Sequence, residues 1–460
     1  MDDRPKSVFS EASRQKKYIT TIGIYYCTFT LGICMSFLNP TMLDFSHKFD
    51  SSVDYVSKVF TVNFACYLFG ALGGGVLMKV LNRQFFVMIA LTLMTVPLFT
   101  IPFATTPMIF FVLAGVMGFG SGGYDAAQVA WIIDIWRHEA APFILTQHFA
   151  FSLGTLIPAL IQGPYLTEEV DEEGCPTSTE DYTISTTASY GEGGRNNTTD
   201  EPFESRLATP FTVAGGLVLV SIVIQIVLYL FAYRTTKLSN NDKEKEVVEK
   251  MPETKIIPEL PPKGTLKQQL VIIGLVAAVQ GFYQGLEVCT GQFIPTFARF
   301  SEVCLSEKKA AQIALMLQLG FSGGRLIGII LVLKIAPHFL LAGNFILIVA
   351  ANTILLVLGG SNVTWLWVGS IAMGAGMSTV FPAVYAYIEK YLFVTDSIAA
   401  FVAVSGGLVS CVYPIVVGNS VENSPAILTY VNFLSIAVCL VTFVVLFYIT
   451  HIKGSKKAAS

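Results

Sequence analysis

Charged residues are scarce in this 460-residue sequence: Asp, Glu, Lys and Arg together make up 13% of it, whereas 53% is hydrophobic. Soluble domains of this total length need far more polar surface to face water. Most of the protein surface is therefore expected to face lipid. Because the net charge is only −3 and the sequence has no basic patch, nucleic acid is not expected as a partner.

Short catalytic and metal-binding motifs are also missing. The sequence contains neither the His-Glu-x-x-His motif of zinc enzymes nor a phosphate-binding P-loop. We therefore expect no enzyme, no metal site and no cofactor, apart from a coupling ion such as Na+ or H+. The eight cysteines suggest no disulfide framework, because most lie in apolar stretches. Cys175 and Cys304 fall in expected outer loops, where a bridge between them is possible.

Hydrophobic residues, by contrast, gather in runs of roughly 20 or more, the length of helix that crosses a hydrocarbon core of about 30 Å. We count twelve runs, six in each half of the chain, and predict an all-α membrane protein. The first six lie at 18–43, 56–78, 85–103, 107–136, 142–166 and 209–233. The second six lie at 270–297, 310–333, 339–358, 365–392, 398–417 and 426–448.

Two polar segments interrupt this pattern, and they differ in character. Segment 167–206 is acidic and rich in Ser and Thr, and it carries overlapping glycosylation acceptor sequences at Asn196 and Asn197. We expect a glycosylated outer loop, with chance sequons in an exposed loop as the alternative. Segment 234–267 mixes Lys with Glu and then Pro, which is typical of a solvated linker. The predicted organisation is a tail (1–17), six helices (18–233), a linker (234–267), six helices (268–450) and a second tail (451–460).

Basic residues flank both ends of the hydrophobic block, five before the first run and three after the last. The positive-inside rule places such segments in the cytoplasm, and an even number of helices puts both termini on one side. We therefore expect a multi-pass protein with cytoplasmic termini. The plasma membrane is the expected location, with an endomembrane as the alternative, because helix length does not distinguish the two.

The two halves resemble each other in sequence. The fourth run contains a series of glycines and ends with Asp134, and the tenth contains another series before Glu389. Six-helix repeats related by an axis along the membrane normal are the plan of major facilitator proteins. We therefore predict that fold, with two pseudo-symmetric halves. Asp134, Arg137 and Glu389 lie at helix ends and are interpreted as gate or interface charges.

Polar residues inside the fourth run are the first candidates for a site. Asp125 lies near its middle, Gln128 shares its helix face at i+3, and Tyr124 is adjacent. An unpaired carboxylate at bilayer depth is unfavourable unless it faces a cavity or a partner. We interpret Asp125 and Gln128 as substrate- or ion-binding residues and Tyr124 as a ring that stacks on a sugar. A structural hydrogen bond between helices is the alternative for Asp125.

The seventh run carries a longer polar series. Gln280, Gln284, Glu287 and Gly291 follow at i, i+4, i+7 and i+11 and so lie on one helix face, with Tyr283 beside them. In lipid, such a face requires water, substrate or another helix. We predict that this face lines a wet chamber between the halves and that Glu287 binds a coupling ion or a sugar there.

Two further polar residues lie within the runs. Arg325 of the eighth run either lines the same chamber or extends its charge to the membrane surface. His148 of the fifth run, next to Gln147, either lines the chamber or is a satisfied packing residue. Arg325 and His148 are both included as candidate binding residues.

Several of these motifs resemble those of one branch of the major facilitators. Asn39-Pro40-Thr41 resembles a Gly-Pro-Thr motif, the segment 125–154 matches at the spacing of its motifs, and Tyr283-x-Gly-x-Glu287 resembles a Tyr-x-Gly-x-Glu motif. The branch is the sodium-dependent glucose transporter group (major facilitator domain-containing protein 4), which is itself similar to bacterial fucose permease. The resemblance covers nearly all the helices, and it adds Asn39 to the candidate binding residues.

The resemblance implies a sugar transporter in which Asp125 is the carboxylate that binds the coupling cation. The sequence departs from the group at Val129, where the group has an asparagine, and at Asn63, where it has an arginine. Sodium dependence and glucose as substrate therefore follow from kinship and not from these residues.

The predicted mechanism is alternating access, in which two halves rock about a site near the middle of the bilayer. Asp125 and Glu287 are expected to couple Na+ or H+ to the uptake of a hexose or similar small polar solute. The alternatives are a facilitative carrier for another small organic solute and a non-transporting membrane sensor. We expect a monomer whose partners are the solute and the bilayer.

Overall fold

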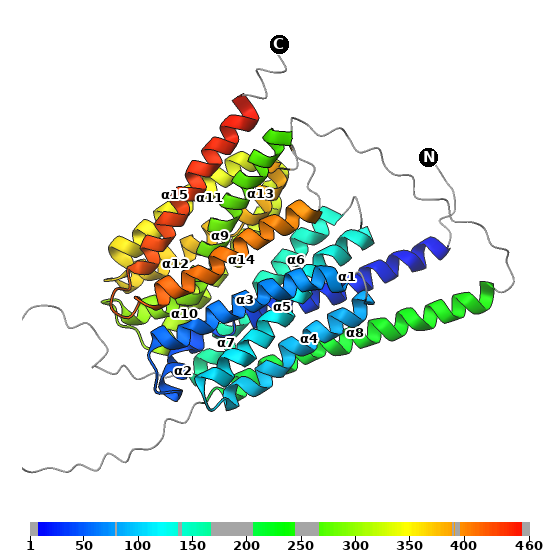
Figure 1. Ribbon diagram of the computed structural model, residues 1–460, viewed down its shortest axis with the longest axis horizontal. Coiled ribbons are helices and arrows are strands. Elements are labelled where there is room, and N and C mark those ends of the chain that lie inside the picture. Colours follow the sequence, from blue (N-terminus) through cyan, green and yellow to red (C-terminus); the bar gives the residue numbers. More distant parts are fainter. Residues whose placement is uncertain are drawn as a thin grey trace, which may run out of the picture.

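The computed structural model describes residues 8–78, 81–136, 140–166, 206–243, 266–388, 391 and 396–452, and these residues form a helical bundle without strands (Figure 1). The first half consists of α1 (Val8–Ser36), η1 (Asn39–Thr41), α2 (Met42–Lys48), α3 (Val53–Leu77), α4 (Arg83–Thr100), η2 (Ile101–Phe103), α5 (Pro107–Trp136), α6 (Ala140–Gly154), α7 (Ile157–Gln162), η4 (Gly163–Tyr165) and α8 (Ala208–Lys243). The second half consists of α9 (Leu266–Phe300), α10 (Glu307–Lys334), α11 (Pro337–Ile354), η6 (Leu355–Gly359), α12 (Val363–Met377), α13 (Val380–Ile388), α14 (Asp396–Gly418), α15 (Ile427–Phe447) and η7 (Tyr448–Ile452).

All twelve predicted runs are helical, which confirms the all-helical fold. Ten segments are long and apolar enough to cross a membrane by length and composition, and Val404–Gly418 is a shorter apolar helix. The remaining run is α10, a helix of 28 residues whose apolar face is interrupted by polar side chains. The protein is therefore a multi-pass membrane protein.

Three of the predicted runs each contain two α-helices instead of one. The first divides into α1 and η1 with α2, the fifth into α6 and α7, and the tenth into α12 and α13. A proline (Pro40, Pro158 or Pro382) lies four or five residues after the end of the first piece in each case. Proline has no N–H for the carbonyl four residues earlier, and its ring clashes with that carbonyl, so each break follows from a proline inside an apolar run.

Glycines allow the pseudo-equivalent helices of the two halves to pack closely. A Cβ added to Gly122 of α5 would lie 1.9 Å from the carbonyl oxygen of Tyr67 on α3. In the second half, a Cβ added to Gly374 of α12 would lie 2.0 Å from the carbonyl oxygen of Leu317 on α10. The glycine series seen in the fourth and tenth runs thus serves the same contact in each half, since only a residue without Cβ permits it.

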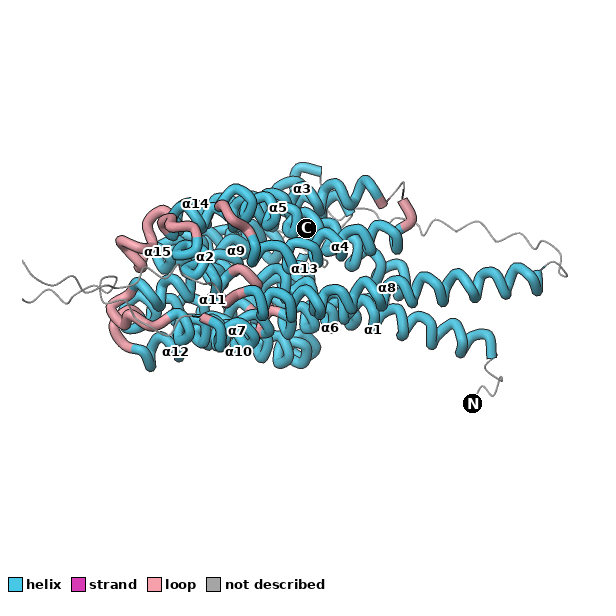
Figure 2. Tube along the Cα trace, turned by 90° about the horizontal axis from the view of Figure 1, so that it is seen from below, coloured by secondary structure: helices cyan, strands magenta, loops and turns pink. Residues whose placement is uncertain are grey.

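The halves touch where α3 packs on α14 and where α6, α7 and η4 pack on α10, and η1 also contacts α9 and α10. The free ends of α1 and α15 lie on the same side of the bundle, and α1 and α8 extend beyond the other helices there (Figures 1 and 2). We call this side the terminal end and the opposite side the distal end. At the distal end, the backbone N–H of Val53 donates to Glu422 at 2.9 Å, and Gly418 packs directly against Ser57.

Candidate functional site

Asp125 is the centre of a polar network inside the first half. The Tyr67 hydroxyl on α3 donates to Asp125 Oδ2 at 2.5 Å, and the Gln128 amide on α5 donates to Oδ1 at 2.5 Å. Gln128 in turn accepts a hydrogen bond from the hydroxyl of Thr28 on α1. One carboxylate therefore joins three helices, and its partners in this network are all neutral. The close approach of α3 to α5 at Gly122 places Tyr67 within reach.

Tyr124 has a packing role instead of the stacking role expected from the sequence. Its side chain is buried, and its hydroxyl donates to the carbonyl of Ile24 on α1 at 3.2 Å. The expectation that its ring faces a sugar is therefore corrected, because the helix turn that directs Asp125 toward α3 directs the neighbouring side chain toward α1.

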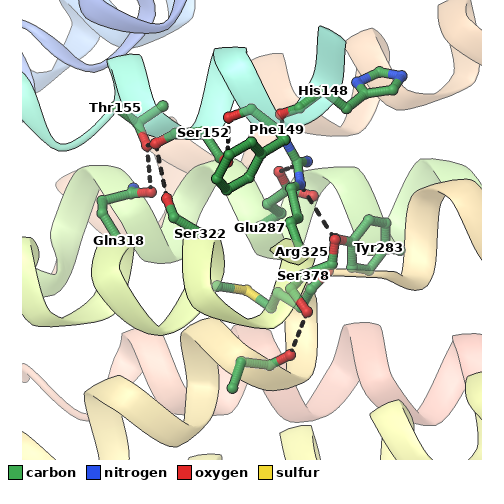
Figure 3. Close-up of polar contacts among 12 residues, drawn as sticks. His148, Phe149, Ser152, Thr155, Tyr283, Glu287, Gln318, Ser322, Arg325 and Ser378 are labelled. Carbon is green, nitrogen blue, oxygen red and sulfur yellow. Dashed lines mark hydrogen bonds and ion pairs between the residues drawn. The ribbon is translucent and has the colours of Figure 1, made fainter. Parts of the chain in front are cut away.

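Arg325 of α10 is the centre of a second network, shown in Figure 3. Its Nη2 lies 3.9 Å from Glu287 Oε1 on α9, and its Nε donates to the carbonyl of Ser378 at 3.2 Å. Its Nη1 donates to the carbonyl of His148 on α6 at 2.8 Å, so this guanidinium crosses from the second half to the first. The group also lies over the Phe321 ring, 4.1 Å from its centroid. Arg325 therefore keeps its charge inside the bundle and does not extend it to the membrane surface.

The break between α12 and α13 supplies two carbonyls to this network. Pro382 cannot donate to the carbonyl of Ser378, which would be its partner in a continuous helix, and Arg325 takes that place. The Tyr283 hydroxyl donates to the carbonyl of Met377 at 2.5 Å. Tyr283 is buried, and its hydroxyl caps the end of the broken helix; solute binding by Tyr283 stays a prediction.

His148 takes part through its backbone and not through its ring. Only its carbonyl meets Arg325, while the imidazole points away from the network in Figure 3 and packs against Phe381 with ring centroids 5.4 Å apart. A lining role for the His148 side chain stays a prediction. A partly exposed ring beside an aromatic residue is compatible with the packing alternative.

The polar series on α9 does not line one continuous chamber. Gln280 is fully buried, and neither atom of its amide has a hydrogen-bond partner among the described residues. Gln284 packs against α14, where a Cβ added to Gly406 would lie 2.0 Å from its Oε1. Glu287 keeps 21% of its side chain exposed and faces Arg325. Because α9 is covered by α14 and α15 as well as by α10, helical spacing alone did not determine which of these residues faces the interface.

A ladder of hydrogen bonds joins α6 of the first half to α10 of the second. Besides the contact of Arg325 with the His148 carbonyl, the Ser322 hydroxyl donates to the carbonyl of Ser152 at 2.9 Å. The Thr155 hydroxyl donates to Gln318 Oε1 at 2.9 Å. The contacting positions are 148 and 152 on α6 and 155 directly after it, and 325, 322 and 318 on α10, so both segments contribute residues three or four positions apart. That spacing was a signal in the sequence that our interpretation missed for Ser322 and Gln318.

Asn39 lies in η1, where the first half contacts α9 and α10. It is buried, and its Oδ1 has no hydrogen-bond partner within the described part of the chain. Its Nδ2 lies near Gly291 of α9, as does Nε2 of Gln318. The structure thus brings together Asn39 and Gly291, two positions singled out from the sequence, with Gln318, which was not.

A family model for the Major Facilitator Superfamily matches residues 24–414. The chain belongs to this superfamily. The match covers both halves, and membership in this transporter family agrees with the absence of an enzyme motif from the sequence.

Relatives within the Major Facilitator Superfamily are distant. The human protein named sodium-dependent glucose transporter 1 is 24% identical over 394 residues, which are 84% of this chain and 71% of the relative. The Xenopus tropicalis protein named major facilitator superfamily domain-containing protein 4A is 22% identical over 477 residues, covering 96% and 92% of the two chains. These names agree with the resemblance drawn from Asn39-Pro40-Thr41 and from the motif around Glu287.

Among solved structures, the crystal structure of a D-xylose-proton symporter superposes with a TM-score of 0.65 at 11% sequence identity, over 94% of this chain and 97% of that one. At this identity the likeness establishes the fold. It agrees with the two six-helix halves expected of a major facilitator protein.

In this major facilitator fold, the two candidate carboxylates occupy separate networks. Asp125 is bonded within the first half, whereas Glu287 lies beside Arg325 in the second, and no hydrogen bond or ion pair among the described residues joins the two carboxylates. Both side chains remain partly exposed. Convergence of the two carboxylates on one shared chamber, as expected from the sequence, therefore stays a prediction.

Other sequence predictions lie at the periphery. Asp134 forms an ion pair with Arg83 at 2.5 Å, and Arg137 and Glu389 lie outside the described residues. Cys304 is disulfide-bonded, while Cys175 lies outside the described residues, so the pairing of these two stays a prediction. Asn196 and Asn197 also lie outside them, as does most of the linker. Within the described ranges, no group of three or more His, Cys, Asp or Glu side chains could hold a metal ion.

Proposed function

We propose that the protein is a secondary active transporter that moves a hexose or a similar small polar solute by alternating access. The observation that carries this proposal is the Arg325 network. A buried guanidinium at membrane depth contacts a carboxylate of its own half and the backbone of the other half. Ionisable groups are kept at such depth where they serve a pathway for solute or ions.

The nature of the solute is inferred from two directions. One relative is named for glucose and the structural neighbour for D-xylose, and both names describe sugars. Besides the paired charges of Arg325 and Glu287, the polar groups at the interface are amides and hydroxyls, including Gln318, Thr155 and Asn39, which suit hydroxyl groups better than charged solutes. A neutral polyhydroxylated solute is the class that fits both observations.

The conformation fits one stage of alternating access. The halves meet at the distal end, where Val53 contacts Glu422 and Ser57 contacts Gly418. With cytoplasmic termini, as the basic flanking residues indicate, the distal end faces the outside. This conformation is then closed to the outside, and solute enters or leaves by the terminal end.

Asp125 is the better candidate for coupling, and Glu287 has a different role. The hydrogen-bond partners of Asp125 are neutral, so a proton or Na+ can neutralise its carboxylate. Glu287 already faces the cation of Arg325. We assign Asp125 to the coupling ion and Glu287 to holding Arg325 in place between the halves.

Uptake of radiolabelled D-glucose into proteoliposomes, with imposed sodium and proton gradients, tests the function. The wild type should concentrate the sugar under one of the gradients. Asp125→Asn should abolish this dependence, leaving only equilibration, because an amide does not take up a proton near neutral pH and has no negative charge to balance Na+. Glu302→Gln, a change in an exposed loop carboxylate, is the matched control and should behave as wild type.

Other outcomes of the same assay support the alternatives. Uptake by the wild type that never exceeds equilibration under either gradient would indicate a facilitative carrier. Absence of saturable uptake of any small solute would favour a membrane sensor. Accumulation by Asp125→Asn equal to that of wild type would contradict the coupling role.

A further inference from the structure

Gly291 lies where one polar side chain from each half of the protein approaches α9, with room left for a methyl group. A Cβ built at this residue would meet two side-chain nitrogens, Gln318 Nε2 at 3.5 Å and Asn39 Nδ2 at 3.9 Å. Gln318 belongs to α10 of the second half and Asn39 to η1 of the first. Two amides from opposite halves therefore converge on a point where the backbone of α9 carries no side chain.

The Asn39 amide is incompletely satisfied at this point. The residue is 8% exposed, and its Oδ1 has no hydrogen-bond partner among the residues that the structure describes. Buried amide oxygens are bonded in nearly all cases, to protein, to water or to a ligand. An unsatisfied acceptor beside two converging amide nitrogens indicates a partner that both donates and accepts hydrogen bonds.

Gln318 is held in a fixed orientation by the other half. The hydroxyl of Thr155, directly after α6, lies 2.9 Å from Gln318 Oε1, and it also lies 2.8 Å from the carbonyl of Ser152, so its proton is shared between two acceptors. This contact occupies Oε1 of Gln318 and leaves Nε2 directed toward Gly291. The ladder between α6 and α10 thus positions a donor at the space beside α9.

We infer that Asn39, Gln318 and Gly291 form a subsite for a hydroxyl group of a neutral polyhydroxylated solute. A hydroxyl accepts from an amide N–H and donates to an amide oxygen, which is the pattern these side chains present. Gly291 is required because a methyl group there would occupy the position of the hydroxyl. The inference rests on the proposed transport function and deepens it, since it names residues that discriminate between solutes.

The subsite also links binding to the conformational change. Asn39 moves with the first half and Gln318 with the second, so opening of the distal end separates them. A hydroxyl held by both amides therefore stabilises the conformation that is closed at the distal end, through contacts that the other conformation lacks.

Competition by monodeoxy glucoses against radiolabelled D-glucose uptake in proteoliposomes tests this subsite. The variants are Gly291→Ala, whose methyl fits at ordinary contact distances, and Gln318→Met, which keeps length and removes the amide. Gly323→Ala on α10 is the control, because a Cβ there meets nothing within 4 Å. We expect KM for glucose to rise about tenfold or more in both variants and not in the control, as for loss of one or two hydrogen bonds.

The deoxy series separates a subsite from a structural effect. In the wild type, the monodeoxy glucose that lacks the hydroxyl bound at the subsite should inhibit uptake of radiolabelled glucose more weakly than unlabelled glucose does. In Gln318→Met the two should inhibit equally, because the amide that binds this hydroxyl is already gone. An equal loss for all analogues, or an unchanged KM in both variants, would overturn the subsite while wild-type glucose uptake leaves the transport function standing. If the wild type neither takes up D-glucose nor gains thermal stability from it, both the subsite and the proposed function are overturned.

Discussion

At the scale of single residues, Arg325 explains how a cation is tolerated inside an apolar bundle. Its planar fork of donors is directed to the carbonyls of Ser378 and His148, its charge faces Glu287, and its flat surface lies on Phe321. Lysine offers a single ammonium point charge and could not reach these directions at once. A buried ionic group of this kind depends on every partner being present.

The Arg325 and Glu287 pair should show energetic coupling. Arg325→Met and Glu287→Gln should each lower the free energy of unfolding by about 1–3 kcal/mol, because each leaves buried partners unpaired. The double variant should lose about 1–2 kcal/mol less than the sum, a moderate value for a pair separated by 3.9 Å. Thermal unfolding in detergent measures these values, with Lys309→Met as an exposed control. Strict additivity would show that the pair is not coupled.

At the scale of elements, the broken tenth segment has the clearest role. Pro382 divides it into α12 and α13 and leaves the Ser378 carbonyl to Arg325. Because Arg325 also holds the His148 carbonyl, a proline in the second half helps to position a contact with the first. The sequence contained this proline, but the consequence depended on which side chain lay beside the freed carbonyl.

Restoring a backbone donor at this break should weaken transport without unfolding the protein. The backbone N–H gained in Pro382→Ala can donate to the Ser378 carbonyl and so compete with Arg325. The change also removes a proline, which in the interior of a regular helix lowers stability by about 3 kcal/mol. We expect an unfolding temperature equal to or above wild type and glucose uptake lowered by roughly an order of magnitude. Pro337→Ala, at the first turn of α11, is the control and should change neither property. Unchanged uptake in Pro382→Ala would argue against the role of the break.

At the scale of the whole molecule, the two halves form separate polar networks that meet in a few places. Asp125 is the centre of the network in the first half and Arg325 of the network in the second. The ladder of hydrogen bonds from α6 to α10 joins the two halves. The contact of α3 with α14 is a second interface between the halves, near the distal end. Rocking of the halves therefore requires the α6–α10 and α3–α14 contacts to open or slide while the network inside each half stays intact.

A cross-link across the distal end should stop this motion. A Cβ at Gly418 would lie 3.0 Å from Ser57 Cβ, slightly closer than in a disulfide, so a small shift permits the bond. Ser57→Cys with Gly418→Cys should form a disulfide on oxidation and lower uptake at least tenfold. Dithiothreitol should restore it, and the single variants should remain insensitive. Full uptake by the oxidised, cross-linked protein would mean that the distal end need not open.

Local features of the sequence predicted the helices well and the site only in part. Twelve apolar runs became helical segments because a run of this length in lipid must satisfy its own backbone hydrogen bonds. The adjacency of Asp125 and Gln128 likewise followed from helical spacing within one element. Tyr67 and Thr28, their partners on other helices, had no such signal.

By itself the sequence determined the membrane environment, the helix positions, the repeat of the halves and the presence of polar residues at bilayer depth, because each depends on composition and spacing along one chain segment. Only the tertiary structure decided that Gln280 is enclosed, that His148 acts through its carbonyl and that Gln318 lies beside Gly291. The physical reason is that a helix in a bundle has neighbours on most of its faces. Periodicity defines the faces, but the packing of the other helices determines which face meets the opposite half.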